Sequence, residues 1–306
     1  MVRYPEVTER DEALMRLLAR GCVLRTDQAL RFFDAEAYGY KRLQQLQKRG
    51  YLKRCARYLQ VTATGLRVLG VDGPALRLRK DWQWEHRARI ADICFALPNW
   101  QFQFALEVKR CNRDVYKNAR FDAVIAKDGR SLALYLVGEV RNSTLAGLKR
   151  DWSVLRAWGL SGAVVLCRDE AALSSLDAPD LLRDLNLSRL FVLPYPQGVA
   201  VLNNVTELHR QAAELFPGFV RCSRPFADLE RGHVLVSFLI TNDLIKRSLL
   251  QGYIAHVRDK EARRNVIVCL ESQKARFAEF FPGAEIVTVP GPVCQENPEK
   301  GEAARV

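Results

Sequence analysis

Hydrophobic residues near the start of the chain recur at the spacing of an amphipathic helix. Leu14, Leu17 and Leu18 lie three and one positions apart, so they share one helical face. Thr8 precedes this row and can open a capping box, and Gly21 marks the end of the segment. The pattern predicts a first helix between these two residues.

Two further helices are expected before residue 50. Residues 28–33 read as a short second helix, with Thr26 as its N-cap. Asp34 is expected to cap a third helix that runs to about Arg49, where Gly50 ends it. Three short helices in this order are typical of a helix-turn-helix domain.

The third helix is expected to be the recognition helix of that domain. Tyr40, Leu43, Leu46 and Gln47 recur at helical spacing and are predicted to pack on the core. The basic residues of the helix fall largely outside this row and are predicted to contact DNA: Lys41, Arg42, Lys48 and Arg49.

Residues 51–62 are predicted to form two short strands around a basic turn. Lys53, Arg54 and Arg57 would lie on or near this hairpin, where they can contact a DNA backbone. A closing helix is expected to start at Thr62. Residues 1–78 are therefore interpreted as a winged helix-turn-helix domain that binds double-stranded DNA. The alternative is an ordinary solvated basic face on a winged helix that mediates protein contacts.

The charge distribution supports the same part of the chain as the DNA-binding candidate. The formal net charge is +12. Residues 1–80 contain 17 Lys and Arg against 8 Asp and Glu, so this quarter of the sequence carries most of the excess.

The central region has the pattern of an αβββαβ unit, predicted over residues 79–188. A helix is expected over residues 85–95 and an alternating strand over residues 100–108. Two more strands carry Asp122 and Glu139, and a helix over residues 144–158 leads to a buried strand.

The acidic residues of this region have the spacing of a metal-dependent nuclease site. Asp122 is followed after sixteen residues by Glu139, and Arg141 stands two positions further on. Two strands that each end in one acidic residue are also common in other α/β proteins. The order of the surrounding elements favours a nuclease-like core over this second interpretation.

The segment resembles the core of the restriction-endonuclease-like, or PD-(D/E)xK, nucleases. The resemblance implies that Asp122 and Glu139 bind Mg²⁺, with Arg141 in the place of the usual lysine. Glu107 or Glu85 would complete the metal site. Arginine stays protonated and cannot transfer a proton as a lysine does, so the resemblance leaves open either an altered active site or a degenerate nuclease fold.

A second register of the same motif is present in the sequence. Asp92 is followed after fourteen residues by Glu107, and Lys109 is then in the lysine position. This register is less favoured, because Asp92 lies in a predicted helix and no strand precedes it.

The winged helix together with this core resembles the plasmid replication-relaxation family over residues 8–170. The resemblance is carried by the helix order, the segment from Leu43 to Leu52, the helix start at Thr62 and Gly65, and the two acidic strands. It implies a DNA-binding accessory protein of mobile elements, often without catalysis.

Residues 189–289 are predicted to form a further α/β region. Continuous apolar strands alternate with helices, which favours a small, mostly parallel sheet. Short strands are expected at 190–194 and 199–202, and a helix at 207–216. Residues 290–306 are expected to be a flexible tail. The region carries no nucleotide-binding motif, and dimerisation or partner docking are the roles considered for it.

The composition of the chain bears on its cellular location and on zinc binding. No apolar run approaches the roughly 20 residues of a membrane helix, and no apolar signal region follows Met1, so a cytoplasmic location without membrane association is expected. The eight cysteines are widely spaced and predict reduced thiols, not a zinc site.

The preferred hypothesis is a DNA-binding accessory protein for plasmid replication, relaxation or transfer, with a degenerate nuclease-like domain. A homodimer and contacts with replication or transfer proteins are considered as further partners. The alternatives are a Mg²⁺-dependent nuclease or nickase that uses Asp122 and Glu139, and a dimeric transcriptional regulator.

Overall fold

The computed structural model describes residues 7–111, 118–177, 182, 185, 187–257 and 261–292 of the chain. Over these residues the fold contains three sheets and is mixed α/β, the class that the sequence predicted. The chain divides into the compact units Met1–Leu134 and Tyr135–Val306, and the division falls within β6 (Arg130–Val137).

The first helix, α1 (Glu9–Ala19), begins and ends where the sequence predicted. The Thr8 hydroxyl oxygen accepts a hydrogen bond from the backbone N–H of Asp11 at 3.3 Å, and Asp11 Oδ2 accepts the Thr8 N–H at 2.8 Å, which completes the capping box. Gly21 has φ +102°, a conformation that favours glycine, and turns the chain out of the helix.

The second and third helices are confirmed, but their predicted caps are wrong. Thr26 is the first residue of α2 (Thr26–Leu30), and its hydroxyl donates to the Arg57 carbonyl at 3.0 Å. The third helix, α3 (Glu36–Lys48), is preceded by Ala35 as N-cap residue, while Asp34 forms an ion pair with Arg10.

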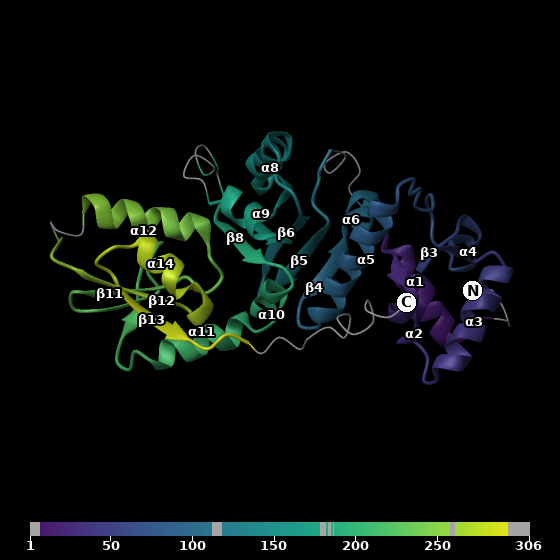
Figure 1. Cartoon of the computed structure of the whole chain (residues 1–306), viewed down its shortest axis with the longest axis horizontal. Helices are drawn as coiled ribbons and strands as arrows, with labels where there is room; N and C mark the ends of the chain where they lie inside the picture. Colours follow the sequence, from purple (N-terminus) through teal and green to yellow (C-terminus); the bar gives the residue numbers. More distant parts are fainter. Residues whose placement is uncertain are drawn as a thin grey trace, which may run out of the picture. The chain divides into compact units, whose positions relative to one another are not determined.

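The predicted hairpin is confirmed as the strands β2 (Leu52–Cys55) and β3 (Tyr58–Val61). A short strand that the sequence analysis missed, β1 (Leu24–Arg25), pairs antiparallel with β3, which gives the sheet order β1-β3-β2. The closing helix expected from Thr62 is α4 (Ala63–Val68), and the Thr62 side chain accepts a hydrogen bond from the Gly65 N–H as its N-cap. Helices α1, α2 and α4 contact β3, and Figure 1 shows them in the same part of the chain.

The buried row of α3 agrees with the predicted row at Leu43 and Leu46 but not at Tyr40 or at Gln47, which is half-buried. Gly39, Leu43 and Leu46 are buried, and Tyr40 is 43% exposed. A Cβ atom on Gly39 would lie 2.7 Å from a methyl carbon of Leu30, so a larger residue at this position would require the Leu30 side chain to shift.

Polar contacts join this N-terminal region to the next helix within the first unit. Arg25 forms a largely buried ion pair with Asp92 of α5 (Asp81–Ala96) at 2.8 Å, and the Gln28 amide donates to the Ala88 carbonyl at 3.0 Å. Asp92, the acid of the less favoured register, therefore has a structural partner. These contacts connect the two regions on either side of the domain boundary predicted between residues 78 and 79.

The second sheet has the strand order β4-β5-β6-β7-β8. After α5 the elements are β4 (Gln101–Phe104), α6 (Ala105–Cys111), β5 (Ala123–Lys127), β6, α8 (Asn142–Val154), β7 (Gly162–Cys167), α9 (Glu170–Ser175) and β8 (Arg189–Pro194). The strand predicted over residues 100–108 ends at Phe104, so Glu107 lies on a helix. Glu139 and Arg141 lie beyond the end of β6. Strand β8, assigned to the C-terminal region in the sequence analysis, belongs to this sheet.

The third sheet has the order β13-β12-β11-β10-β9. Its elements are α10 (Gln197–Asn203), α11 (Val205–Glu214), β9 (Val220–Arg221), β10 (Leu229–Arg231), β11 (Val234–Phe238), α12 (Leu244–His256), β12 (Arg264–Leu270), α14 (Lys274–Phe280) and β13 (Glu285–Val289). The strand predicted over residues 199–202 is wrong, since these residues belong to α10. Strands β11, β12 and β13 are parallel as predicted, whereas β9 and β10 are antiparallel additions. Figure 1 shows α12 and α14 beside these strands.

The second and third sheets repeat one sequence of elements. In both, a helix is followed by three strands, a helix, a strand, a helix and a last strand, and the strands lie in the sheet in chain order. The first copy runs from α5 to β8 with α6 as an insertion, and the second runs from α11 to β13.

Backbone hydrogen bonds fix the correspondence between the copies at the residue level. The N–H of Asp122 donates to Leu134 O at 2.8 Å, and the N–H of Asp228 donates to Val236 O at 2.8 Å. The backbone carbonyl of each aspartate accepts a hydrogen bond from the residue that follows the first strand of its copy. The donors are the N–H groups of Ala105 after β4 and of Cys222 after β9, both at 2.9 Å. Asp228 therefore occupies the backbone position of Asp122.

No helix within the described ranges is long and apolar enough to cross a membrane. The tail predicted for residues 290–306 lies outside the described residues from position 293 onward.

Candidate nucleic-acid interface and acidic site

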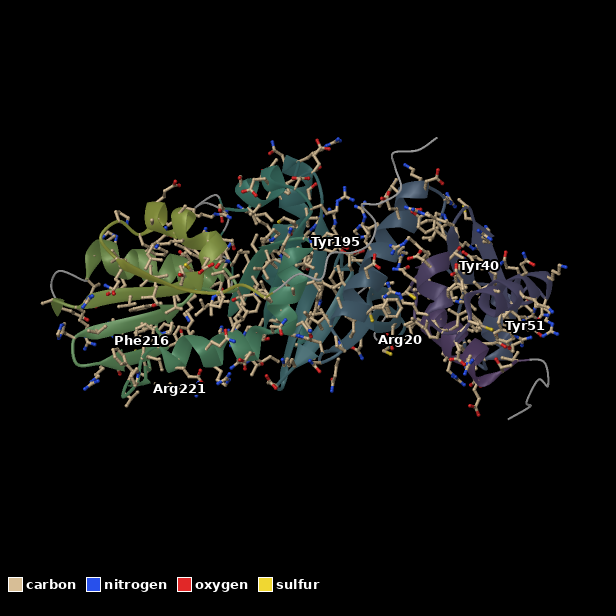
Figure 2. The ribbon with its side chains drawn as sticks, turned by 60° about the horizontal axis from the view of Figure 1, so that its bottom comes forward. Arg20, Tyr40, Tyr51, Tyr195, Phe216 and Arg221 are labelled. Atoms are coloured by element: carbon tan, nitrogen blue, oxygen red, sulfur yellow. The ribbon has the colours of Figure 1, made fainter. Side chains whose placement is uncertain are left out.

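Basic side chains on α3 are divided between the surface and the interior. Lys41 and Lys48 are exposed, and Arg49 is half-buried at the end of the helix. Tyr38 and Tyr40 are also exposed, 47% and 43%, which adds aromatic surface to the same helix. Figure 2 shows Tyr40 and Tyr51 in this N-terminal region.

Arg42 has a different place from the predicted one. Its Nε donates to Asp11 Oδ2 at 2.8 Å, and its Nη1 donates to the Gln45 side chain at 2.8 Å. Asp11 is fully buried, so the pair joins α1 to α3 inside the domain. Because its guanidinium is paired with a buried carboxylate, Arg42 is not expected to contact DNA directly, contrary to the prediction.

The β2–β3 hairpin presents three basic residues. Lys53, Arg54 and Arg57 are exposed, and Arg54 Nε donates to the Ala56 carbonyl at 2.7 Å. The Arg57 guanidinium lies 5.5 Å from the centre of the Tyr58 ring. With Arg42 excluded, the basic residues that remain for a nucleic-acid surface are Lys41, Lys48, Arg49, Lys53, Arg54 and Arg57.

Asp122 was predicted to lie on a strand, but it stands directly before β5, and its carboxylate contacts a histidine. His86 Nε2 of α5 lies 2.7 Å from Asp122 Oδ1, and the two side chains are 25% and 20% exposed. Phe121, in the position where the nuclease motif has proline, is buried in the core.

Glu139 and Arg141 contact each other and are solvated. Arg141 Nη2 lies 2.8 Å from Glu139 Oε2, and their side chains are 72% and 71% exposed. The hydrogen bond from Arg141 lowers the pKa of the Glu139 carboxyl. These residues belong to the second unit, whereas Asp122 belongs to the first.

The two other predicted acidic ligands are also engaged by arginines. Glu107 accepts a hydrogen bond from Arg20 Nε at 3.0 Å, and the same arginine donates to the Phe102 carbonyl. Figure 2 labels Arg20. Glu85 is paired with Arg89 at 2.6 Å along α5.

The carboxylates predicted to bind Mg²⁺ therefore have basic partners. In the part of the chain that the structure covers, no three His, Cys, Asp or Glu side chains are gathered as metal ligands. A divalent cation at Asp122 or Glu139 would have to compete with these partners for the carboxylate oxygens.

A pocket of about 190 Å³ lies beside Asp122 in the first unit. Its wall comes from the end of α1, from α5, from the β4–α6 junction and from the segment before β5: Gly21, Cys22, Arg87, Ile90, Phe104, Ala105, Lys109, Ala119, Arg120, Phe121 and Asp122. The lining contains three basic side chains and one carboxylate.

The groups in this wall differ in charge and burial. Arg87 Nη1 donates to the Gly21 carbonyl at 3.0 Å, and Lys109 Nζ donates to the Ala119 carbonyl at 2.6 Å. Burial lowers the pKa of Arg87, and the charge of Asp122 opposes that change. Burial raises the pKa of the Cys22 thiol, which is therefore neutral at pH 7.

Sequence reasoning found Asp122 and missed the pocket around it. Its basic residues come from three separate segments, so no spacing in the sequence links them. The sequence pointed to Lys109 only as the lysine of the less favoured register with Asp92 and Glu107. Asp228 was also missed, because its relation to Asp122 is visible only in the backbone hydrogen bonds.

No family model matches the chain, and no curated protein or solved structure matches it.

Proposed function

We propose that the chain is a sequence-specific double-stranded DNA-binding accessory protein of a mobile element, active in plasmid replication, relaxation or transfer. The N-terminal element order α1-β1-α2-α3-β2-β3 is the order of a winged helix, in which the third helix enters the major groove and the hairpin contacts the backbone. The observation that carries the proposal is the set of exposed basic residues on α3 and on the hairpin.

Phosphate contacts and base contacts are assigned to different parts of this surface. Lys53, Arg54 and Arg57 on the hairpin are expected to bind phosphates, which fixes orientation without reading sequence. Lys41 and Lys48 on α3 lie on the helix that would face the base edges. Arg42 would act indirectly, by holding α3 against α1 through Asp11.

The test is binding of the full-length chain to fluorescently labelled duplexes. The double variant Lys53→Ala/Arg54→Ala is expected to weaken binding to all duplexes to a similar degree, because phosphate contacts are independent of sequence. Lys48→Ala is expected to reduce the preference for the best duplex, by about 1 to 3 kcal/mol if it reads a base.

The matched control removes two exposed basic residues elsewhere, Arg221 on β9 and Lys274 on α14. Arg221→Ala/Lys274→Ala is expected to bind DNA as the wild type does. Equal losses in the hairpin and control variants would mean that binding follows total charge only, and would contradict the proposed surface.

For the central region we propose a restriction-endonuclease-like framework without metal catalysis. The order α5-β4-β5-β6-α8-β7 supports the framework, and the pairing of each predicted acidic ligand with a basic residue supports the loss of catalysis. If Mg²⁺ binds, Asp122 and Glu139 are the residues predicted to hold it.

The nuclease alternative is tested with supercoiled and linear DNA in the presence of Mg²⁺ or Mn²⁺. The proposal predicts no cutting by protein that binds the same DNA. Cutting that is abolished by EDTA and by Asp122→Ala, with DNA binding retained, would establish the nuclease instead.

A further inference from the structure

The pocket beside Asp122 has a lining suited to an anion. Arg87 comes from α5, Lys109 from α6 and Arg120 from the segment before β5, so three chain segments bring positive charge to one cavity. Asp122 is the acidic residue among the lining residues, and it is hydrogen-bonded to His86. The pocket therefore has a net positive lining.

Arg87 is half-buried, which strengthens the effect of its charge. A charged group in a low-dielectric environment interacts more strongly with an incoming ion than a solvated one does. Its guanidinium stays protonated at neutral pH, and its planar N–H donors match the oxygens of a phosphate group. The bond to Gly21 fixes the direction of one of these donors.

The same lining disfavours a divalent cation. Three basic groups repel a metal ion, and the one carboxylate in the wall is already engaged by His86. A pocket of about 190 Å³ is large enough for a phosphate group together with part of the molecule that carries it.

We propose that this pocket binds a phosphate group through Arg87, Lys109 and Arg120. The phosphate can belong to a small phosphorylated molecule or to the DNA backbone, since both present the same oxygens. The assignment does not depend on DNA binding by α3 and the hairpin, because it rests on other residues.

The test is isothermal titration of the full-length chain with inorganic phosphate, with a deoxynucleoside 5′-monophosphate, and with sodium chloride at equal ionic strength. Saturable binding of phosphate and of the nucleotide, but not of chloride, is expected. Arg120→Gln is expected to weaken it by about tenfold or more, which corresponds to the loss of one hydrogen bond to a charged group.

Two further variants keep the test independent of folding. Lys109→Arg keeps a charge at the pocket and should retain binding, whereas Lys109→Met should lose it. Arg130→Gln removes an exposed charge from the start of β6, outside the lining, and should bind phosphate as the wild type does. Circular dichroism checks that each variant is folded.

A DNA titration separates the two sources. If inorganic phosphate does not bind but Arg120→Gln weakens DNA binding while Arg130→Gln does not, the DNA backbone supplies the phosphate. If no phosphate compound binds and DNA affinity is unchanged in Arg120→Gln, the proposal is overturned. It is also overturned if phosphate binds equally to the wild type, Arg120→Gln and Lys109→Met.

Discussion

Asp122 and Asp228 occupy one backbone position in two copies of the same arrangement of elements, yet their side chains have different partners. Asp122 contacts His86, which comes from the helix before the sheet. Asp228 forms an ion pair with Lys246 from the helix after the third strand, and it also accepts the Phe238 N–H at 2.5 Å. The repeated backbone fixes where the acid stands, and the side chains around it determine what the acid does.

The residues around the two aspartates also differ. The pocket with three basic residues lies beside Asp122. Lys246 is 14% exposed and also donates to the Phe238 carbonyl at 3.1 Å, so its charge is used to hold α12 against β11. We infer that Asp228 has a mainly structural role, whereas Asp122 lies where a ligand can enter.

The largest loss of stability among these variants is expected from Lys246→Met. The change removes the partner of a half-buried carboxylate, and it should lower the free energy of unfolding by about 2 to 3 kcal/mol. The five tryptophans of the chain lie between residues 82 and 158, so their fluorescence reports on the first copy. Hydrogen exchange of β11 and α12 measures the second copy.

A second change at Asp228 provides the control. The double variant Lys246→Met/Asp228→Asn should recover part of the lost stability, because it removes the uncompensated charge. A single variant Lys246→Met that is as stable as the wild type would show that the ion pair does not hold the second copy together.

A smaller loss of stability is expected when the residue that caps α12 is changed. Asp243 is buried and accepts hydrogen bonds from the N–H groups of Leu190 at 3.2 Å and Ile245 at 3.1 Å. Asp243→Ala should cost about 1 to 2 kcal/mol through loss of the helix cap. Hydrogen exchange at the start of α12 measures this loss.

Arg141 is the matched position in the first copy, since it precedes α8 as Asp243 precedes α12. Its side chain is exposed, so Arg141→Ala should change stability by less than about 0.5 kcal/mol. Equal costs for the two variants would contradict the difference drawn between the copies.

A small loss of stability is also expected from His86→Phe in the first copy. The pair with Asp122 is partly solvated, so its removal should cost about 1 kcal/mol or less, measured by tryptophan fluorescence during urea unfolding. A loss larger than that of Lys246→Met would reverse the comparison and make Asp122 the more structural acid.

Local signals in the sequence were enough to predict much of the fold. The Thr8 capping box, the basic hairpin and the strand that follows Asp122 are each encoded within a few residues, and the structure contains all three. Strand β1 was missed because two residues are too few to show alternation. Residues 199–202 were read as a strand because a short apolar run does not distinguish a strand from a helix.

The candidate site was less predictable, because its partners are distant in the sequence. Arg42 has the helical position of a surface residue, and only the fold brings it to the buried Asp11, 31 positions away. His86 reaches Asp122 across 36 positions. Long-range ion pairs of this kind depend on how the elements pack, which no local spacing reports.

The most direct test of the proposed function is the salt dependence of DNA binding by the full-length chain. Six basic residues remain on α3 and the hairpin, so the slope of log K against log salt concentration should be about −5, at about −0.9 for each phosphate contact. The slope should become less steep by about 2 in Lys53→Ala/Arg54→Ala. A slope near zero, or an unchanged slope in that variant, would contradict DNA binding by this surface.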